Sequence, residues 1–290
     1  MSLSSLQRWS AAFLLLAASA AHAQAEPERT GGPYVPTPQV VVDQMLSVAN
    51  IGASDFVLDL GAGDGVIVLT AAERYKARGL GVEIDPKLVA YANGEAARRG
   101  IADRANFQVL DVFKADVSRA SVITLYLLPG MMINLRPKIY AEAKPGTRIV
   151  SHDYHFDEWR ADDSISFDVP EKEKVNGVPR ATVYLWIVPA KIAGRWAVEM
   201  EGGEKLDLAL RQTWQVIDGT AQGKNGRVKL QDTQLRGENV RFAFVNHGRR
   251  VVFEGTVTAD GMKGVVDLGG GKKARWTATR AANAATASVQ

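Results

Sequence analysis

The sequence contains no cysteine among its 290 residues. Disulfide bonds and thiolate metal sites are therefore excluded, and an oxidising compartment poses no hazard to the chain. The sequence also lacks a long lysine/arginine run, and its net charge of +3 is too small to indicate nucleic-acid binding. With 46% hydrophobic and 23% charged residues, the chain is long enough for two ordinary globular domains.

The beginning of the chain has the pattern of a secretory signal peptide. Arg8 precedes an apolar stretch from Ala11 to Ala21, and Ala21-His22-Ala23 matches a small-residue cleavage site. The stretch is too short to span a bilayer comfortably, so we expect no stable membrane span after cleavage. We predict a signal peptide over 1–23, a spacer over 24–32 and an exported, periplasmic protein. An uncleaved membrane anchor is the alternative.

A strand, a glycine-rich loop and a helix follow one another early in the chain. Phe56–Leu60 is an apolar run typical of a buried parallel strand, and Val66–Tyr75 has helical spacing. Between them, Gly61, Gly63 and Gly65 suit a turn that needs positive φ or that lets a ligand reach the backbone. This order predicts a nucleotide-type site at the carboxyl end of a parallel strand.

The acidic residues around this loop indicate which ligand it takes. A dinucleotide fingerprint has its third glycine one residue later, where Val66 stands here. The carboxylates of Asp59 and Asp64 would repel a pyrophosphate, but they suit a ligand that carries an ammonium and a sulfonium. S-adenosylmethionine, a cationic adenosine derivative without phosphate, is therefore the predicted cofactor. NAD is the more distant alternative.

Two further acids follow predicted strands. Glu83 lies near the end of the run Leu80–Ile84, where dinucleotide folds place the acid that binds the ribose hydroxyls. Asp111 follows the strand Asn106–Leu110 and could accept a hydrogen bond from the adenine amino group. The alternatives are an exposed strand-end charge for Glu83 and a plain turn residue for Asp111.

A proline-rich loop precedes the first predicted helix. Thr37 and Pro38 fit the N-cap and first position of a helix that runs to about Asn50. Tyr34 and Thr37 either pack and cap within this loop or close over the donor. The sequence leaves both interpretations open.

Ser121–Leu128 is a nearly continuous apolar run and is predicted to be the central strand. Its carboxyl end should lie beside the transferred methyl group. Methyl transfer is an in-line displacement that requires alignment and exclusion of water. Tyr126 and Pro129 are therefore our catalytic candidates for lining the methyl acceptor, with a core aromatic as the alternative for Tyr126. The next helix is expected to break at Pro137.

The first domain should end with an antiparallel pair. Ser164–Val169 and Ala181–Val188 have strand patterns, and the polar stretch Glu171–Pro179 reads as their connection. The cluster from His152 to His155 could suggest a metal, but no third ligand is evident and methyl transfer to nitrogen needs none. We predict no metal site.

From residue 190 the pattern changes to short alternating runs such as Lys205–Arg211. These runs, separated by turn signals such as Asp218-Gly219, predict a small antiparallel all-β barrel or sandwich over 190–280. A disordered tail is expected over 281–290. Three tryptophans are expected to anchor the core of this β-domain, Trp196, Trp214 and Trp276.

Several of these segments together resemble class I S-adenosylmethionine-dependent methyltransferases. More narrowly, they resemble the protein-lysine methyltransferases that act on the ATP synthase c-subunit and the adenine nucleotide translocase. The likeness covers about Pro33 to Val188, within an expected methyltransferase domain over 33–189. The segments are Pro33–Thr37, Asp59–Gly65, Gly81–Ile84, Leu127–Met132 and Trp159.

The resemblance implies a Rossmann-like α/β fold with a seven-stranded sheet, an acceptor site near Pro129 and N-methylation of a protein lysine. The donor contacts that it implies are Tyr34, Thr37, Asp59, Gly61, Gly63, Glu83 and Asp111. We therefore expect an active methyltransferase whose acceptor is a protein or a small molecule and not a nucleic acid. The alternative is an exported binding protein, built on a degenerate methyltransferase fold, with its partner site on the β-domain.

Overall fold

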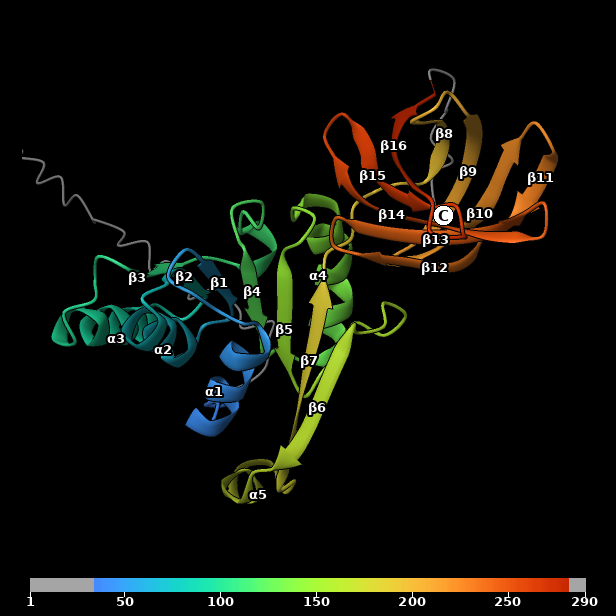
Figure 1. The fold of residues 1–290 in the computed structure, drawn as a ribbon. Helices are drawn as coiled ribbons and strands as arrows, with labels where there is room; N and C mark the ends of the chain where they lie inside the picture. Colours follow the sequence, from blue (N-terminus) through green and yellow to red (C-terminus); the bar gives the residue numbers. More distant parts are fainter. Residues whose placement is uncertain (1–33, 282–290) are drawn as a thin grey trace, which may run out of the picture.

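The computed structural model describes residues 34–281, which form an α/β domain and a β-domain (Figure 1). The expected signal peptide, the spacer, Pro33 and the tail beyond Ala281 lie outside the described residues. No helix within residues 34–281 is long and apolar enough to cross a membrane.

A mixed sheet forms the centre of the α/β domain. Its strands are β1 (Phe56–Leu60), β2 (Arg78–Glu83), β3 (Ala105–Val109), β4 (Val122–Leu125), β5 (Arg148–His152), β6 (Asp163–Asp168) and β7 (Arg180–Ile187). They follow the order β3-β2-β1-β4-β5-β7-β6 in a seven-stranded sheet. β1 to β5 are parallel, and β7 is antiparallel to both β5 and β6. The expected Rossmann-like sheet is confirmed.

Helices cover both faces of this sheet, because successive residues of a strand point to opposite faces. They are α1 (Gln39–Val48), α2 (Val66–Tyr75), α3 (Pro86–Arg98), α4 (Pro129–Glu142) and α5 (Pro170–Asn176), with a 3-10 turn η1 (Val112–Lys114). On one face, Val57 and Val122 belong to the apolar cluster of α1 and α2. On the other, Leu58 and Ile123 belong to the cluster of α4.

α1 begins one residue later than the sequence suggests. The N–H groups of Val41 and Val42 donate to the carbonyl of Pro38, at 2.9 and 3.1 Å. Pro38 is therefore the N-cap, and the expected capping role of Thr37 is wrong. A proline carbonyl accepts as well as any other, and the missing N–H lies where the helix needs no donor.

The chain between β4 and α4 also differs from the prediction. β4 ends at Leu125, opposite Leu60 and Ser151 of its neighbours, so Tyr126–Leu128 lie outside the sheet. α4 then runs through Pro137 without the expected break. A proline inside a helix costs roughly 3 kcal/mol. Full burial of helix residues on both sides of it, such as Leu135, offsets that cost.

The polar connection after β6 contains a helix rather than an extended loop. α5 begins at Pro170, a favourable first helical position, and ends at Gly177 with φ 75°. This helix was not expected, because a stretch this polar has no apolar period. Lys172 is the exception within α5, since its side chain is buried.

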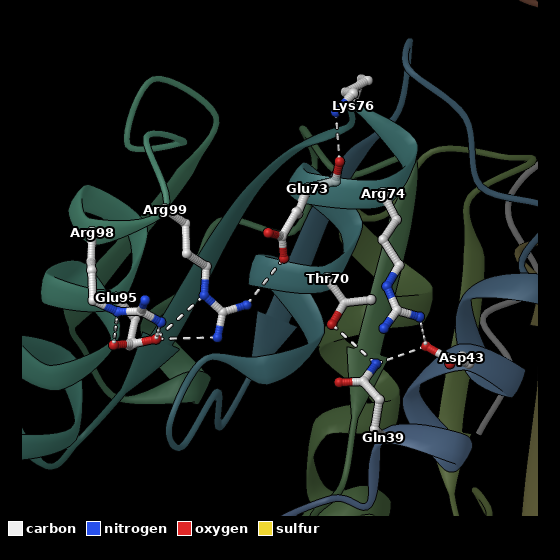
Figure 2. A network of polar contacts seen from close by, with 9 residues as sticks. All are labelled: Gln39, Asp43, Thr70, Glu73, Arg74, Lys76, Glu95, Arg98 and Arg99. Carbon is white, nitrogen blue, oxygen red and sulfur yellow. Dashed lines mark hydrogen bonds and ion pairs between the residues drawn. The ribbon is translucent and has the colours of Figure 1, made fainter.

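Polar contacts connect α1, α2 and α3 at the surface (Figure 2). Arg74 of α2 pairs with Asp43 of α1 at 2.7 Å, and Gln39 donates to Thr70 at 3.3 Å. Exposed ion pairs of this kind contribute little stability individually. Here they act together with the buried face of α1 to fix the helix that follows Tyr34.

The β-domain is one strongly curved antiparallel sheet. Its strands are β8 (Gly194–Met200), β9 (Lys205–Thr213), β10 (Val216–Gly223), β11 (Gly226–Lys229), β12 (Gln231–Arg236), β13 (Asn239–Asn246), β14 (Arg249–Thr258), β15 (Gly261–Asp267) and β16 (Lys273–Arg280). The order is β11-β10-β9-β8-β16-β15-β14-β13-β12. The Thr233 hydroxyl donates to the Ile217 carbonyl at 2.6 Å, which brings β12 back to β10. The sheet is therefore nearly closed, as the predicted barrel requires.

One predicted turn of the β-domain is a strand. Asp218-Gly219 lies inside β10, where Gly219 pairs with Leu210. A Cβ atom at position 219 would be 2.2 Å from the Ala209 carbonyl oxygen. Gly219 therefore allows β9 and β10 to approach each other closely, and the chain does not turn there.

Trp214 packs on the α/β domain, which corrects its expected role in the β-domain core. Its ring lies 5.3 Å from Trp159 in a stacked arrangement and 4.7 Å from Tyr140 edge-on. The Arg136 guanidinium lies 5.3 Å from the same ring. Trp196 and Trp276 are buried in the β-domain core as expected.

These contacts place the β-domain beside the end of α4 and the start of β5 (Figure 1). Lys191 Nζ donates to the Ala141 carbonyl at 2.9 Å, and Gly237 lies against Gly146. The β-domain therefore adjoins the amino end of the parallel strands. The carboxyl ends lie on the opposite side, toward α5.

Candidate active site

A cleft opens at the carboxyl ends of β1 to β4. It encloses about 1130 Å³, counted with the open solvent at its mouth. Ligands of open parallel sheets bind at this edge. Most of the site residues expected from the sequence line it: Tyr34, Thr37, Asp59, Gly61, Gly63, Glu83, Asp111 and Tyr126. We call it the donor cleft.

The glycine loop forms the floor of the donor cleft. Gly61, Gly63 and Gly65 have φ values of 83°, 55° and 84°, as the sequence predicts. The N–H groups of Gly61 and Ala62 donate to the Val82 carbonyl at 2.9 and 3.0 Å. These donors are already used, so the loop does not offer the row of free N–H groups that cradles a phosphate.

Asp59 is the most unusual group of the cleft. Its side chain is 2% exposed and accepts a hydrogen bond from the Thr124 hydroxyl at 2.7 Å. Burial raises the pKa of the Asp59 carboxyl to about 7, and the nearby charges of Asp64 and Glu83 act in the same direction. A cationic ligand stabilises the ionised form of a carboxyl group in this position, and an anionic ligand would destabilise it further.

Glu83 and Asp111 extend the acidic wall of the cleft. The Glu83 carboxylate accepts from Gly63 N–H at 3.0 Å and from Ile84 N–H at 2.8 Å, which fixes its orientation. Asp111 caps η1 by accepting from Phe113 N–H at 3.0 Å. Each carboxylate has lone-pair positions beyond these bonds. Hydroxyl and amino groups of a nucleoside are suitable donors to them.

The loop before α1 closes one side of the cleft. A Cβ atom on Gly63 would lie 2.5 Å from the Tyr34 ring, so only glycine allows this contact. Burial and the neighbouring Asp64 carboxylate raise the pKa of the Tyr34 hydroxyl. Tyr34 and Thr37 thus belong to the cleft wall, and their contact with a donor stays a prediction.

Aromatic rings form the opposite wall. Tyr126 and Tyr154 both line the cleft, with ring centroids 6.2 Å apart and planes 14° from parallel. Pro129 is exposed and is the first residue of α4, next to the lining residue Leu128. The structure therefore brings Tyr126 into the cleft but not Pro129, whose role in the acceptor site stays a prediction.

A buried polar group lies behind the aromatic wall. The His152 ring stacks on Tyr126 at 4.0 Å, is fully buried, and has no hydrogen-bond partner at either nitrogen. Burial lowers the pKa of His152 to about 4, and the Lys172 ammonium also lowers it, against the opposing effect of Asp153. A neutral ring here leaves the aromatic wall without a positive charge.

The donor set of the cleft fits S-adenosylmethionine. Carboxylates on three neighbouring strand ends face one cleft, and one of them is buried strongly enough to favour a cation beside it. Asp59, Glu83 and Asp111 would hold the amino, ribose and adenine groups. The cofactor supplies an electrophilic methyl group on a sulfonium.

Sequence reasoning did not identify Tyr154 or His152 as parts of this wall. Both follow or end β5, the strand that pairs with an antiparallel neighbour. The stacking of His152 on Tyr126 joins two segments 26 residues apart and leaves no local pattern. The only available signal was the expected proximity of parallel strand ends, applied to β4 and β5 together.

Comparison with known proteins identifies the family of the α/β domain. The family model described as the ANTKMT methyltransferase domain matches residues 59–163. The protein-lysine N-methyltransferase of Saccharolobus islandicus (strain REY15A) is 37% identical over 157 residues, which cover 54% of this chain and 93% of that protein. The ATP synthase c-subunit lysine N-methyltransferase of Xenopus laevis is 33% identical, over 45% of this chain and 57% of that protein.

A solved structure supports the same assignment. An RNA methyltransferase from Salinibacter ruber in complex with S-adenosyl-L-homocysteine is 44% identical, with a TM-score of 0.50 over 55% of this chain and 96% of that one. The bound product in that relative agrees with the donor chemistry of the cleft described above. The chain belongs to the class I S-adenosylmethionine-dependent methyltransferases, in the family of the ANTKMT methyltransferase domain.

Proposed function

We propose that this methyltransferase transfers its methyl group to the side-chain amine of a protein lysine. The observation that carries the proposal is the relative from Saccharolobus islandicus, a protein-lysine N-methyltransferase that this chain covers over 93% of its length. The lysine nitrogen would form the new N–C bond as the C–S bond of the donor breaks, and S-adenosylhomocysteine would leave. The lysine must first lose a proton, because its ammonium has no lone pair.

The aromatic wall supports an amine acceptor. Tyr126 and Tyr154 line the cleft with nearly parallel rings, and aromatic rings attract ammonium and methylated ammonium groups. His152 behind them stays neutral at physiological pH, since its pKa is lowered to about 4. A charged imidazolium at this place would instead repel both the amine and the sulfonium.

Incubation of the purified chain with radiolabelled S-adenosylmethionine and a protein extract tests the proposal. We expect label in protein, stable to mild acid and base, and methylated lysine after hydrolysis. Asp59→Ala is the control that removes donor binding. Total RNA is the second acceptor to offer, because the relative from Salinibacter ruber is named an RNA methyltransferase. Label in RNA and none in protein would contradict a lysine acceptor.

We also propose that the enzyme acts after export, in the periplasm. The apolar stretch Ala11–Ala21 and the cleavage pattern that ends at Ala23 support this, and both lie outside the described residues. Fractionation of cells with N-terminal sequencing tests it. A mature chain beginning at Gln24 in the periplasmic fraction is the expected result, and an intact N-terminus in the cytosol would refute export.

A further inference from the structure

The end of the β-domain farthest from the α/β domain has a surface that methyl transfer does not explain. Trp214 and Gly237 contact the α/β domain, and both lie in turns at one end of the antiparallel strands. The turns at the other strand ends therefore lie together on the far side. They comprise residues 200–204, 223–226, 246–249 and 268–272, and we call them the distal mouth.

These turns surround a depression lined by both polar and apolar side chains. Asn225 Nδ2 donates to Asn246 Oδ1 at 3.2 Å, which joins two of the turns. The space between the turns is about 500 Å³, counted with the open solvent at its mouth. Leu206, Phe244 and Val251 are among the apolar side chains that line it.

The rim of the distal mouth is predominantly basic. Three exposed cationic side chains lie in its turns, Lys224, Arg249 and Lys272, and two lie directly beside them, Arg227 and Lys273, where Asp267 is the acidic neighbour. Among the ion pairs of the described residues, none includes any of the five. Glu201 and Glu204 occupy one turn only. Residues 190–281 contain 16 lysines and arginines against 10 aspartates and glutamates, so the positive charge of the whole chain is concentrated in the β-domain.

We propose that the distal mouth binds anionic phospholipid and docks the enzyme on a negatively charged membrane surface. The phosphate lies among the basic side chains. The argument is charge complementarity, since Lys and Arg side chains close to an anionic bilayer are attracted to its surface. The proposal does not depend on which acceptor the methyl group reaches.

The same charges could serve a nucleic acid, but the surface lacks what such a site needs. Proteins that bind single strands stack bases on exposed aromatic rings. The aromatic side chains of the depression, Phe244 and Phe253, are 5% and 0% exposed, because they belong to the core of the β-domain. A lipid headgroup uses the basic rim without requiring a stacking platform.

Sedimentation of the full chain with lipid vesicles tests the proposal. We expect more bound protein with vesicles that contain phosphatidylglycerol than with pure phosphatidylcholine, and an increment that decreases with added salt. The combined variant Lys224→Glu, Arg249→Glu, Lys272→Glu should lose this increment. Calorimetric titration with S-adenosylmethionine should give the wild-type affinity, and an unchanged thermal transition should show that the β-domain of the variant is folded.

A matched variant changes the same number of charges elsewhere. Lys144, Arg195 and Lys263 are exposed and lie away from the distal mouth, so their replacement by glutamate should keep the increment. The apolar stretch Ala11–Ala21 is present in every variant, and pure phosphatidylcholine vesicles measure its contribution separately.

Three outcomes would overturn the proposal. The wild type could bind both vesicles equally, or the distal variant could keep the increment. Alternatively, phosphatidylglycerol could add nothing while single-stranded RNA binds the wild type and not the distal variant. That third result would make the distal mouth a nucleic-acid surface.

Discussion

Asp59 carries a negative charge in a place that does not favour one. Burial raises its pKa from 3.8 to about 7, so the folded protein without ligand holds the proton more tightly than the unfolded chain. The cost of ionising Asp59 is therefore absent below about pH 4, grows as the pH rises, and is complete above about pH 7. The predicted donor contact is therefore a group whose ionisation destabilises the fold.

Asp59→Asn separates the effect of the Asp59 charge on stability from its predicted role in donor binding. The variant should be more stable than wild type at pH 8 by up to roughly 4 kcal/mol, and by much less at pH 5. It should bind S-adenosylmethionine about 100-fold more weakly, because one partner of a buried charge pair is lost. Urea denaturation without ligand and calorimetric titration measure both effects. An unchanged stability at pH 8 would show that the carboxylate is not strained.

His152 gives a pH dependence of the opposite sign. Its pKa is lowered from 6.5 to about 4, so the unfolded chain takes up the proton first as the pH falls. The stability due to the neutral ring is present above about pH 6.5 and is lost toward pH 4. When the pH falls from 7.5 to 5, the protonation of His152 in the unfolded chain should lower the free energy of unfolding of the wild type by about 2 kcal/mol.

His152→Phe should abolish that loss and leave the protein at least as stable at pH 7.5. Phenylalanine keeps the stacking on Tyr126 and removes two unpaired buried nitrogens. His155→Phe is the matched control at an exposed position. If both variants keep the wild-type pH dependence of urea denaturation, another group is responsible.

At this scale the sequence identified one wall of the cleft better than the other. Asp59 and Glu83 lie at the carboxyl ends of parallel strands and Asp111 follows a third, and a parallel sheet brings such ends together. The position of Pro129 could not be predicted, because a shift of one residue along the chain separates a residue that lines the cleft, Leu128, from the first residue of α4. His152 was not identified for a different reason, because its partner Tyr126 follows another strand, β4, and the contact leaves no local pattern.

Among the elements, α5 depends on a single buried contact. The Lys172 ammonium pairs with Asp153, directly after β5, and donates to the Arg180 carbonyl at 2.8 Å. The other described side chains of α5, at positions 170, 171, 173 and 174, are exposed. The contact therefore ties the β6–β7 segment to the residue next to Tyr154.

Lys172→Met should loosen α5 and leave the donor site intact. We expect a loss of about 2 kcal/mol, since Asp153 loses the partner of its charge, and slower methyl transfer with unchanged donor affinity. Hydrogen exchange over residues 170–180 and calorimetry report the two effects. Lys174→Met, exposed on the same helix, is the control. Equal exchange in both variants would contradict the anchoring role.

Helices and strands were predicted correctly where the spacing of apolar residues fits only one type of element. The prediction failed where a short motif is compatible with both a turn and a strand. β1 and α2 have the predicted ends, because an apolar strand and a periodic helix flank an unmistakable glycine loop. Asp218-Gly219 has the composition of a turn, yet its glycine serves strand contact. The apolar run that contains β4 continues into a cleft wall, and hydrophobicity alone cannot show where pairing stops.

On the scale of the whole molecule, Trp214 connects the two domains. Its ring completes an aromatic cluster with Trp159 and Tyr140, beneath the Arg136 guanidinium. Nothing in the β-domain sequence distinguished this tryptophan from Trp196 and Trp276. It lies at φ 55° in the turn between β9 and β10, where it points out of its own domain.

Trp214→Ala should uncouple the domains. We expect a destabilisation of about 3 kcal/mol and the division of one thermal transition into two. S-adenosylmethionine should then raise only the transition of the α/β domain. Differential scanning calorimetry with and without ligand measures this, and Val216→Ala, exposed beside the same turn, is the control. A single transition that the ligand still shifts as a whole would argue against Trp214 as the link.

The β-domain joins the molecule at the edge of the sheet opposite the donor cleft. Substitutions in the outer loops of the β-domain can therefore accumulate without changing the geometry of the donor cleft. The β-domain should therefore be replaceable. A different binding domain attached after Val188, with an aromatic residue that packs where Trp214 does, should direct the same methyl transfer to a different location.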